Sequence, residues 1–170
     1  MFNTGQMLLV LGAIVLFSII LPSLNQVILY NDVNIIVTRV ENSALALAQG
    51  YLSEAATKEF DEVCLTSLPL IASQLTPVAN LGSESGEYYP NFDDLDDYVD
   101  LSLVDSTTFP SVSFTVTGAV DYIDPDNPET TSGSPTFVKR LRITVTSSYL
   151  VDPVSRNTLQ ITLERLYAFY

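Results

Sequence analysis

The chain begins with a long apolar segment that carries no charge. Residues 7–24 read MLLVLGAIVLFSIILPSL, and the first charged residue is Asp32. An uninterrupted apolar run of about 18 residues is long enough to cross a membrane as a helix. No Gly or Pro lies between Ser23 and Gln49, so the helical pattern runs on to about Glu62. It predicts one helix about 84 Å long, far longer than a hydrocarbon core of about 30 Å.

Two residues weaken the predicted helix within its apolar half. Pro22 has no N–H, and its ring clashes with the carbonyl group of Ser18, so we expect a kink or a local opening there. Gly12 weakens the helix more mildly. Membrane helices tolerate both residue types, so an ordinary membrane helix would also fit this pattern.

Beyond residue 32 the apolar positions become periodic. They are alternately four and three residues apart, at Val33, Val37, Val40, Ala44, Leu47 and Tyr51. This spacing predicts an amphipathic continuation of the helix over residues 32–63. The apolar face could pack on the chain's own globular domain. A second apolar strip at Ile36, Leu45, Leu52 and Ala56 would allow another contact at the same time.

Three later segments alternate between apolar and polar residues, as β-strands with one buried face do. They cover residues 111–123, 137–150 and 158–169. Short loops join them, which favours an antiparallel meander. The predicted fold class is α+β: a long N-terminal α-helix, apolar in its first half and amphipathic in its second, packs against a small antiparallel β-sheet. Residues 64–170 then form a globular β-domain.

Composition excludes several classes of function. The chain has 20 acidic and 7 basic residues, a net charge of −13, which disfavours binding to nucleic acid. It has no histidine, the commonest general base and metal ligand, and Cys64 is its only cysteine, so it has no internal disulfide. We therefore expect neither an enzyme nor a bound organic cofactor.

Clustered carboxylates make calcium the one candidate ligand, because calcium binds through six to eight oxygen atoms. The first candidate group, Asp121, Asp124 and Asp126, lies at the loop that follows the first predicted strand. A solvated hairpin is the alternative interpretation. The same two interpretations apply to the acidic loop over residues 82–105, with Asp93, Asp94, Asp96 and Asp97. Aromatic residues among these acidic residues indicate that this loop packs on the domain.

The segment GQMLLVLGAIVLFSIILP, residues 5–22, followed by a small sheet, resembles the type IV pilin family. The family includes major pilins, the pseudopilins of type II secretion systems and archaeal pilins. The resemblance implies that a prepilin peptidase cuts between Gly5 and Gln6, so residues 1–5 form a short leader. Residues 6–31 would then anchor the precursor in the membrane and later form the filament core. The residues directly after Gln6, Met7 to Val10, include no glutamate, so packing alone would set the register between subunits.

The resemblance also implies a function and partners. The chain would be a structural subunit of an extracellular filament, first held in the cytoplasmic membrane and then assembled with identical subunits by a pilus assembly machinery. The implied assembly residues are Leu8, Leu11, Val15, Ile19, Pro22, Val33, Val37 and Val40. Two alternatives stay open: a minor pilin or pseudopilin, and a single-pass, membrane-anchored binding domain outside the cytoplasm.

Overall fold

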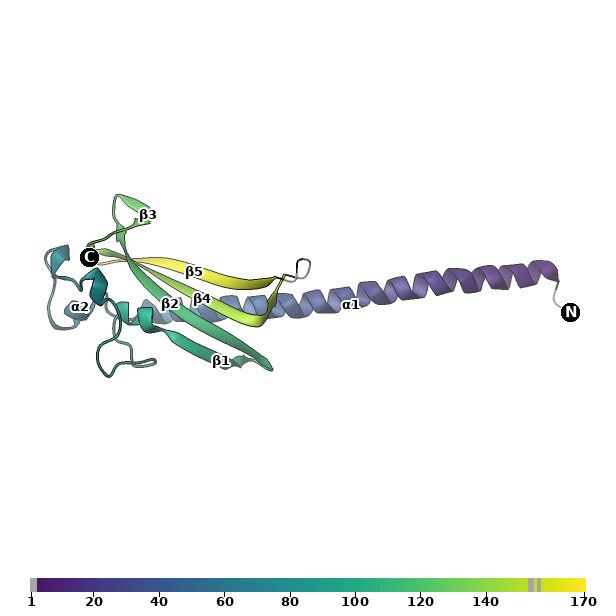
Figure 1. The fold of residues 1–170 in the computed structure, drawn as a ribbon, viewed down its shortest axis with the longest axis horizontal. Helices are drawn as coiled ribbons and strands as arrows, with labels where there is room; N and C mark the ends of the chain where they lie inside the picture. Colours follow the sequence, from purple (N-terminus) through teal and green to yellow (C-terminus); the bar gives the residue numbers. More distant parts are fainter. Residues whose placement is uncertain (1–2, 153–154, 156) are drawn as a thin grey trace. The chain divides into compact units, whose positions relative to one another are not determined.

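The computed structural model describes residues 3–152, 155 and 157–170. The chain divides into two compact units, Met1–Arg39 and Val40–Tyr170. Helix α1 (Thr4–Ala55) supplies the first unit and also the first element of the second (Figure 1). Met1 and Phe2, at the start of the predicted leader, lie outside the described residues.

In the first unit, α1 begins immediately after Asn3. The backbone N–H groups of Gln6 and Met7 donate to the Asn3 carbonyl oxygen at 2.8 and 3.2 Å. Pro22 lies inside the helix, whose bounds run from Thr4 to Ala55 without a break. The kink or local opening expected at Pro22 stays a prediction. Residues 4–39 of the first unit lie in this one helix, so their backbone hydrogen bonds are made locally, as a membrane requires. Pro22 is the exception, because it has no N–H to donate.

The second part of α1 ends earlier than predicted, at Ala55 instead of near residue 62. The N–H groups of Thr57 and Lys58 donate to carbonyl groups three residues earlier, at 2.9 and 3.1 Å, which tightens and closes the last turn. A separate helix, α2 (Glu62–Thr66), then begins, and the side chain of Asp61 caps it by accepting from the Val63 N–H at 3.2 Å. Aspartate favours such capping positions over helix interiors, which explains the break.

The second unit is built on one antiparallel sheet. Its strands are β1 (Ser102–Phe109), β2 (Val112–Asp124), β3 (Asn127–Thr131), β4 (Val138–Val151) and β5 (Thr158–Ala168). The order is β1-β2-β4-β5, and β3 pairs with the end of β2. The three predicted strands correspond to β2, β4 and β5. The prediction missed β1, which begins inside the expected acidic loop, and β3, in which every residue is exposed.

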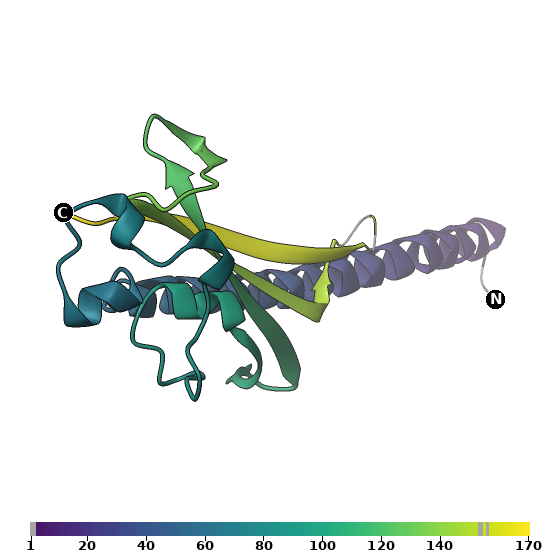
Figure 2. The ribbon, with the colours of Figure 1, turned by 60° about the vertical axis from the view of Figure 1, so that its left-hand side comes forward.

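The core lies between the sheet and the C-terminal part of α1, which runs alongside the four long strands (Figures 1 and 2). Four of the predicted periodic helix positions are buried, namely Val37, Val40, Ala44 and Tyr51, whereas Leu47 is half-buried and Val33 is exposed. Ala48 is also buried, as are alternate residues of β2 and β4, among them Phe114, Val116, Ile143 and Val145. The predicted α+β fold, a long N-terminal helix against a small antiparallel sheet, is confirmed.

Gly118 of β2 permits a close approach of the backbone where the 3-10 helix η3 (Asp96–Asp100) crosses this strand. The Gly118 N–H donates to the Leu101 carbonyl oxygen at 3.0 Å. A Cβ atom at Gly118 would lie 2.0 Å from the Tyr98 carbonyl oxygen, a backbone atom that a side-chain rotation cannot move away.

Replacing Gly118 with alanine is therefore expected to lower the free energy of unfolding by about 3 kcal/mol, the upper end of the usual cost of overpacking. Urea denaturation of the full chain in detergent measures it. Gly133→Ala is the matched control, because an added Cβ there meets nothing within 4 Å, and a change within about 0.5 kcal/mol is expected. Equal stability of the two variants would contradict the predicted clash.

Candidate functional site

The most extensive exposed surface of the first unit is apolar. We call residues 6–36 the apolar segment; its large apolar side chains, from Met7 to Ile36, are each between 46% and 76% exposed. Helix α1 is long and apolar enough to cross a membrane. Such a surface is unfavourable in water by about 25 cal/mol per Å². The apolar segment therefore requires surroundings other than water.

The structure separates the predicted assembly residues into two groups. Leu8, Leu11, Val15, Ile19 and Val33 are exposed in the apolar segment, and Pro22 lies among them. Val37 and Val40 are buried, and Val40 belongs to the core of the second unit. The Val40 side chain therefore packs inside its own domain and is not available for contact with another subunit.

The predicted processing site lies at the start of α1. Gly5 and Gln6 are exposed, in the first turn of the helix. Nothing would meet a Cβ added at Gly5 within 4 Å, so the surroundings of this bond are open. The assignment of a peptidase to this bond stays a prediction.

The second unit contains a fully buried lysine, which sequence reasoning missed. The Lys139 Nζ atom donates to the Phe60 carbonyl oxygen at 2.8 Å, to Asp61 Oδ2 at 2.8 Å and to Asp96 Oδ1 at 2.6 Å. The rings of Phe60 and Tyr122 lie 4.8 and 5.2 Å from Nζ. All three N–H groups are used, so the Lys139 amine has no donor left for a substrate and acts as a structural element.

A network of donors surrounds Asp61, the first partner of Lys139. Its carboxylate accepts from the Tyr122 hydroxyl at 2.8 Å, and from the Thr76 N–H and hydroxyl at 3.1 and 3.0 Å. Burial alone would raise the pKa of Asp61, but the charge of Lys139 and these hydrogen bonds outweigh it and lower the pKa. Asp61 is therefore held in its charged form.

The acidic loop packs on the domain, as its aromatic residues indicated. Asp94, Asp96 and Asp97 are buried, at 1%, 1% and 0% exposure. Asp94 Oδ1 accepts from the N–H groups of Asp96 and Asp97, and Asp97 Oδ2 accepts from those of Asp93 and Asp94. These local bonds form the turn that begins η3. Asp94 also has a pKa raised to about 9, by burial and then by the charges of Asp96 and Asp97.

The predicted calcium residues after the first predicted strand are only partly available. Asp121 lies 3.8 Å from Arg140 and 3.9 Å from Arg142, so cationic side chains already face it. Asp124 Oδ1 accepts the Asp126 N–H at 3.0 Å, an ordinary turn contact. Among the described residues, a different group of three carboxylates brings its oxygen atoms within 4.8 Å of one another. The group consists of Glu84, Glu87 and Asp97.

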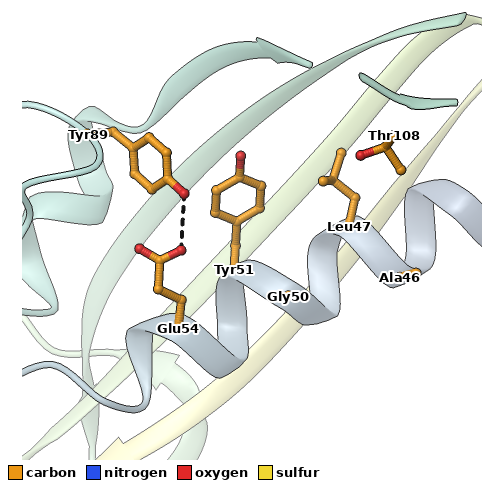
Figure 3. A pocket seen from close by; sticks show the side chains of 7 residues that line it. All are labelled: Ala46, Leu47, Gly50, Tyr51, Glu54, Tyr89 and Thr108. Atoms are coloured by element: carbon orange, nitrogen blue, oxygen red, sulfur yellow. Dashed lines mark hydrogen bonds between the residues drawn. The ribbon is translucent and has the colours of Figure 1, made fainter. Parts of the chain in front are cut away.

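An open pocket of about 410 Å³ lies beside α1. Figure 3 shows the side chains that line it. Its lining residues are Ala46, Leu47, Gly50, Tyr51, Glu54, Tyr89 and Thr108. Glu54 is the one carboxylate in this lining. Each of its oxygen atoms accepts a hydrogen bond from a phenol hydroxyl, from Tyr89 at 3.1 Å and from Tyr98 at 3.3 Å. Two phenol groups therefore engage the one carboxylate of this lining.

Replacing Lys139 with methionine is expected to cost about 3–5 kcal/mol of unfolding free energy, because it leaves two carboxylates buried without a counter-charge. Denaturant unfolding of the full chain in detergent measures this loss. Arg165→Met removes an exposed cation and is expected to cost under about 1 kcal/mol. Adding Asp96→Asn to Lys139→Met should recover part of the loss. A Lys139→Met chain as stable as Arg165→Met would contradict the assigned role.

The lowered pKa of Asp61 predicts a loss of stability in acid. The folded state disfavours protonation of Asp61. Asp61 therefore contributes to the free energy of unfolding above its pKa in the unfolded chain, about 3.9, and this contribution disappears as the pH falls below that value. Thermal unfolding from about pH 6 to pH 2.5 should show a steeper fall for the parent chain than for Lys139→Met, in which Asp61 lacks its cation. Parallel curves would contradict this role of Lys139.

The chain was compared with family models, curated proteins and solved structures. No family model matches it, no curated protein matches it, and no solved structure matches it.

Proposed function

We propose that the chain is a structural subunit of a type IV pilus-like extracellular filament. The subunit is held in the membrane by the apolar segment before assembly, and the same segment packs against identical subunits afterwards. The domain from Val40 onward lies outside the filament core. A prepilin peptidase and an assembly machinery act on the subunit in this proposal.

The exposure of the apolar segment is the observation that carries the proposal. Its large apolar side chains point to all sides of the helix, and none is less than 46% exposed. A helix that is apolar all round is stable only when it is surrounded on every side. Lipid surrounds it before assembly, and neighbouring copies of the same helix surround it in a filament.

The second unit supports the proposal because it is complete without the apolar segment. Its core contains side chains from Val40–Ala55, η3 and the sheet, and extends over both long central strands, β2 and β4. The domain therefore does not need residues 6–36 to bury its sheet. This leaves the apolar segment free to serve either membrane anchoring or assembly.

A second candidate is a single-pass protein that remains in the membrane and presents its acidic domain outside the cytoplasm. The specific observation in its favour is that α1 is long and apolar enough to cross a membrane by itself. A minor pilin or pseudopilin lies between the two candidates, because it enters a filament in few copies. Abundance in surface fibres distinguishes all three.

The first experiment looks for the chain in fibres. Surface material is sheared from the cells that produce the protein, examined by negative-stain microscopy, and analysed by mass spectrometry. The filament proposal expects fibres in which this chain is the main component and begins at Gln6. Fibres that lack the chain, while the chain stays in the membrane fraction, would instead support the membrane-anchored candidate.

A double substitution separates assembly from membrane insertion. Leu11→Ala with Val15→Ala keeps the segment apolar, but it removes buried methyl groups at about 0.8 kcal/mol per CH₂ from every helix contact in a filament. We expect the chain to stay in the membrane fraction while fibre yield falls at least severalfold. Fibre yield is counted by microscopy, and the membrane fraction is quantified by immunoblot.

The matched control is Leu68→Ala with Leu70→Ala. These leucines are 72% and 79% exposed but belong to the second unit, after α2. Their replacement should leave fibre yield unchanged. Unchanged fibre yield for Leu11→Ala with Val15→Ala as well would argue against packing of the apolar segment in the filament core.

A further inference from the structure

Glu84, Glu87 and Asp97 meet at the surface of the second unit, although Asp97 lies ten positions after Glu87 in the sequence. The Glu87 N–H donates to the Glu84 carbonyl oxygen at 3.0 Å, and the Glu84 N–H donates back to Glu87 Oε2 at 3.3 Å. This turn contains Gly86, whose φ of 103° favours glycine. Asp97 approaches it from η3. Two distant parts of the acidic loop thus bring their carboxylates together.

The spacing of the oxygen atoms fits a bound cation. One carboxylate oxygen from each residue lies within 4.8 Å of the other two. Calcium binds oxygen at about 2.3–2.6 Å, so oxygen atoms on opposite sides of one ion lie up to about 4.6–5.2 Å apart. A single ion can therefore contact all three carboxylates, and water can fill its remaining positions.

The second observation is a buried oxygen atom without a donor. Asp97 is 0% exposed, and its Oδ2 atom accepts from the N–H groups of Asp93 and Asp94 at 2.9 and 3.2 Å. Its other oxygen, Oδ1, has no hydrogen-bond partner among the described residues. A buried carboxylate oxygen without a partner is costly, and it is unusual in folded proteins. A cation bound by Asp97 would supply a partner to this carboxylate.

The local charges also favour a cation. The ion pairs of the described residues use Lys139, Arg140 and Arg142, and none involves these three carboxylates. Among these ion pairs, no cationic side chain offsets the repulsion between the three carboxylates.

We infer that Glu84, Glu87 and Asp97 bind a divalent cation of the calcium type. The ligands are all oxygen atoms, and two of them come from a surface turn, an irregular arrangement that calcium accepts and magnesium does not. With three protein ligands, the affinity should be in the range of extracellular modules, a dissociation constant of about 10⁻⁴–10⁻³ M. The bound ion would fasten the turn of Glu84 and Glu87 to η3.

The full chain in detergent is the material for the test, in about 0.15 M NaCl so that general screening of its negative charge is already present. Isothermal titration with calcium chloride should show one ion per chain. About 10 mM calcium should raise the thermal midpoint above that in sodium chloride or magnesium chloride of equal ionic strength, because the ion binds only the folded state. No binding heat and no shift at that concentration would overturn the inference.

Glu84→Gln with Glu87→Gln should lower the calcium affinity at least tenfold and abolish the thermal shift. Glu84 is exposed and Glu87 half-buried, so the variant should fold, with a midpoint without calcium at least equal to that of the parent. Asp124→Asn with Asp126→Asn removes the same charge at the other predicted site and should bind as the parent does. Retained binding in the first variant, or equal losses in both, would overturn the assignment to this site.

Discussion

The buried ammonium group of Lys139 fixes the arrangement of three distant segments. It connects β4 to the residues before α2 through Phe60 and Asp61, and to η3 through Asp96. Removing one partner of a buried ion pair is far more costly than never burying the pair, so the three segments depend on one another. Because Asp96 is held, η3 stays on β2 at Gly118, and the neighbouring Asp97 keeps its place under the turn of Glu84 and Glu87. The candidate cation site thus depends on a lysine that does not contact it.

Periodicity in the sequence was enough to predict the elements that bury one face. The heptad spacing from Val40 to Tyr51 and the alternation of β2, β4 and β5 correspond to the observed core. Strand β3 could not be predicted this way, because all of its residues are exposed and no face is selected for apolar side chains. Lys139 lies two residues before Leu141 and so falls on the same face of β4 as Leu141, Ile143 and Val145, which are buried. This position was the signal in the sequence that its side chain points inward. Its burial could not be predicted from this position alone, because a buried lysine requires partners, which only the fold brings together.

The acidic residues show a different limit of sequence reasoning. A count of carboxylates selects Asp121, Asp124 and Asp126 as readily as the acidic loop, because both segments are dense in aspartate. Register decides between them: Asp121 is paired with Arg140 across β2 and β4, which places a cationic side chain against the carboxylate. Glu84, Glu87 and Asp97 have no such neighbour among the described ion pairs, and their meeting depends on a turn and on η3. Neither contact is encoded by spacing along the chain.

The two units place opposite demands on self-association. The apolar segment gains free energy when copies pack closely, by about 25 cal/mol for each Å² removed from water. The net charge of −13 opposes such packing, because like charges on neighbouring copies repel. Salt screens this repulsion beyond about 8 Å at physiological ionic strength. The free energy gained by burying the apolar segment depends on contact between the helices and not on the distance between the acidic domains. A chain that keeps its charge in one unit and its apolar surface in the other can therefore pack helices tightly, provided that the acidic domains stay more than a screening length apart or bind cations.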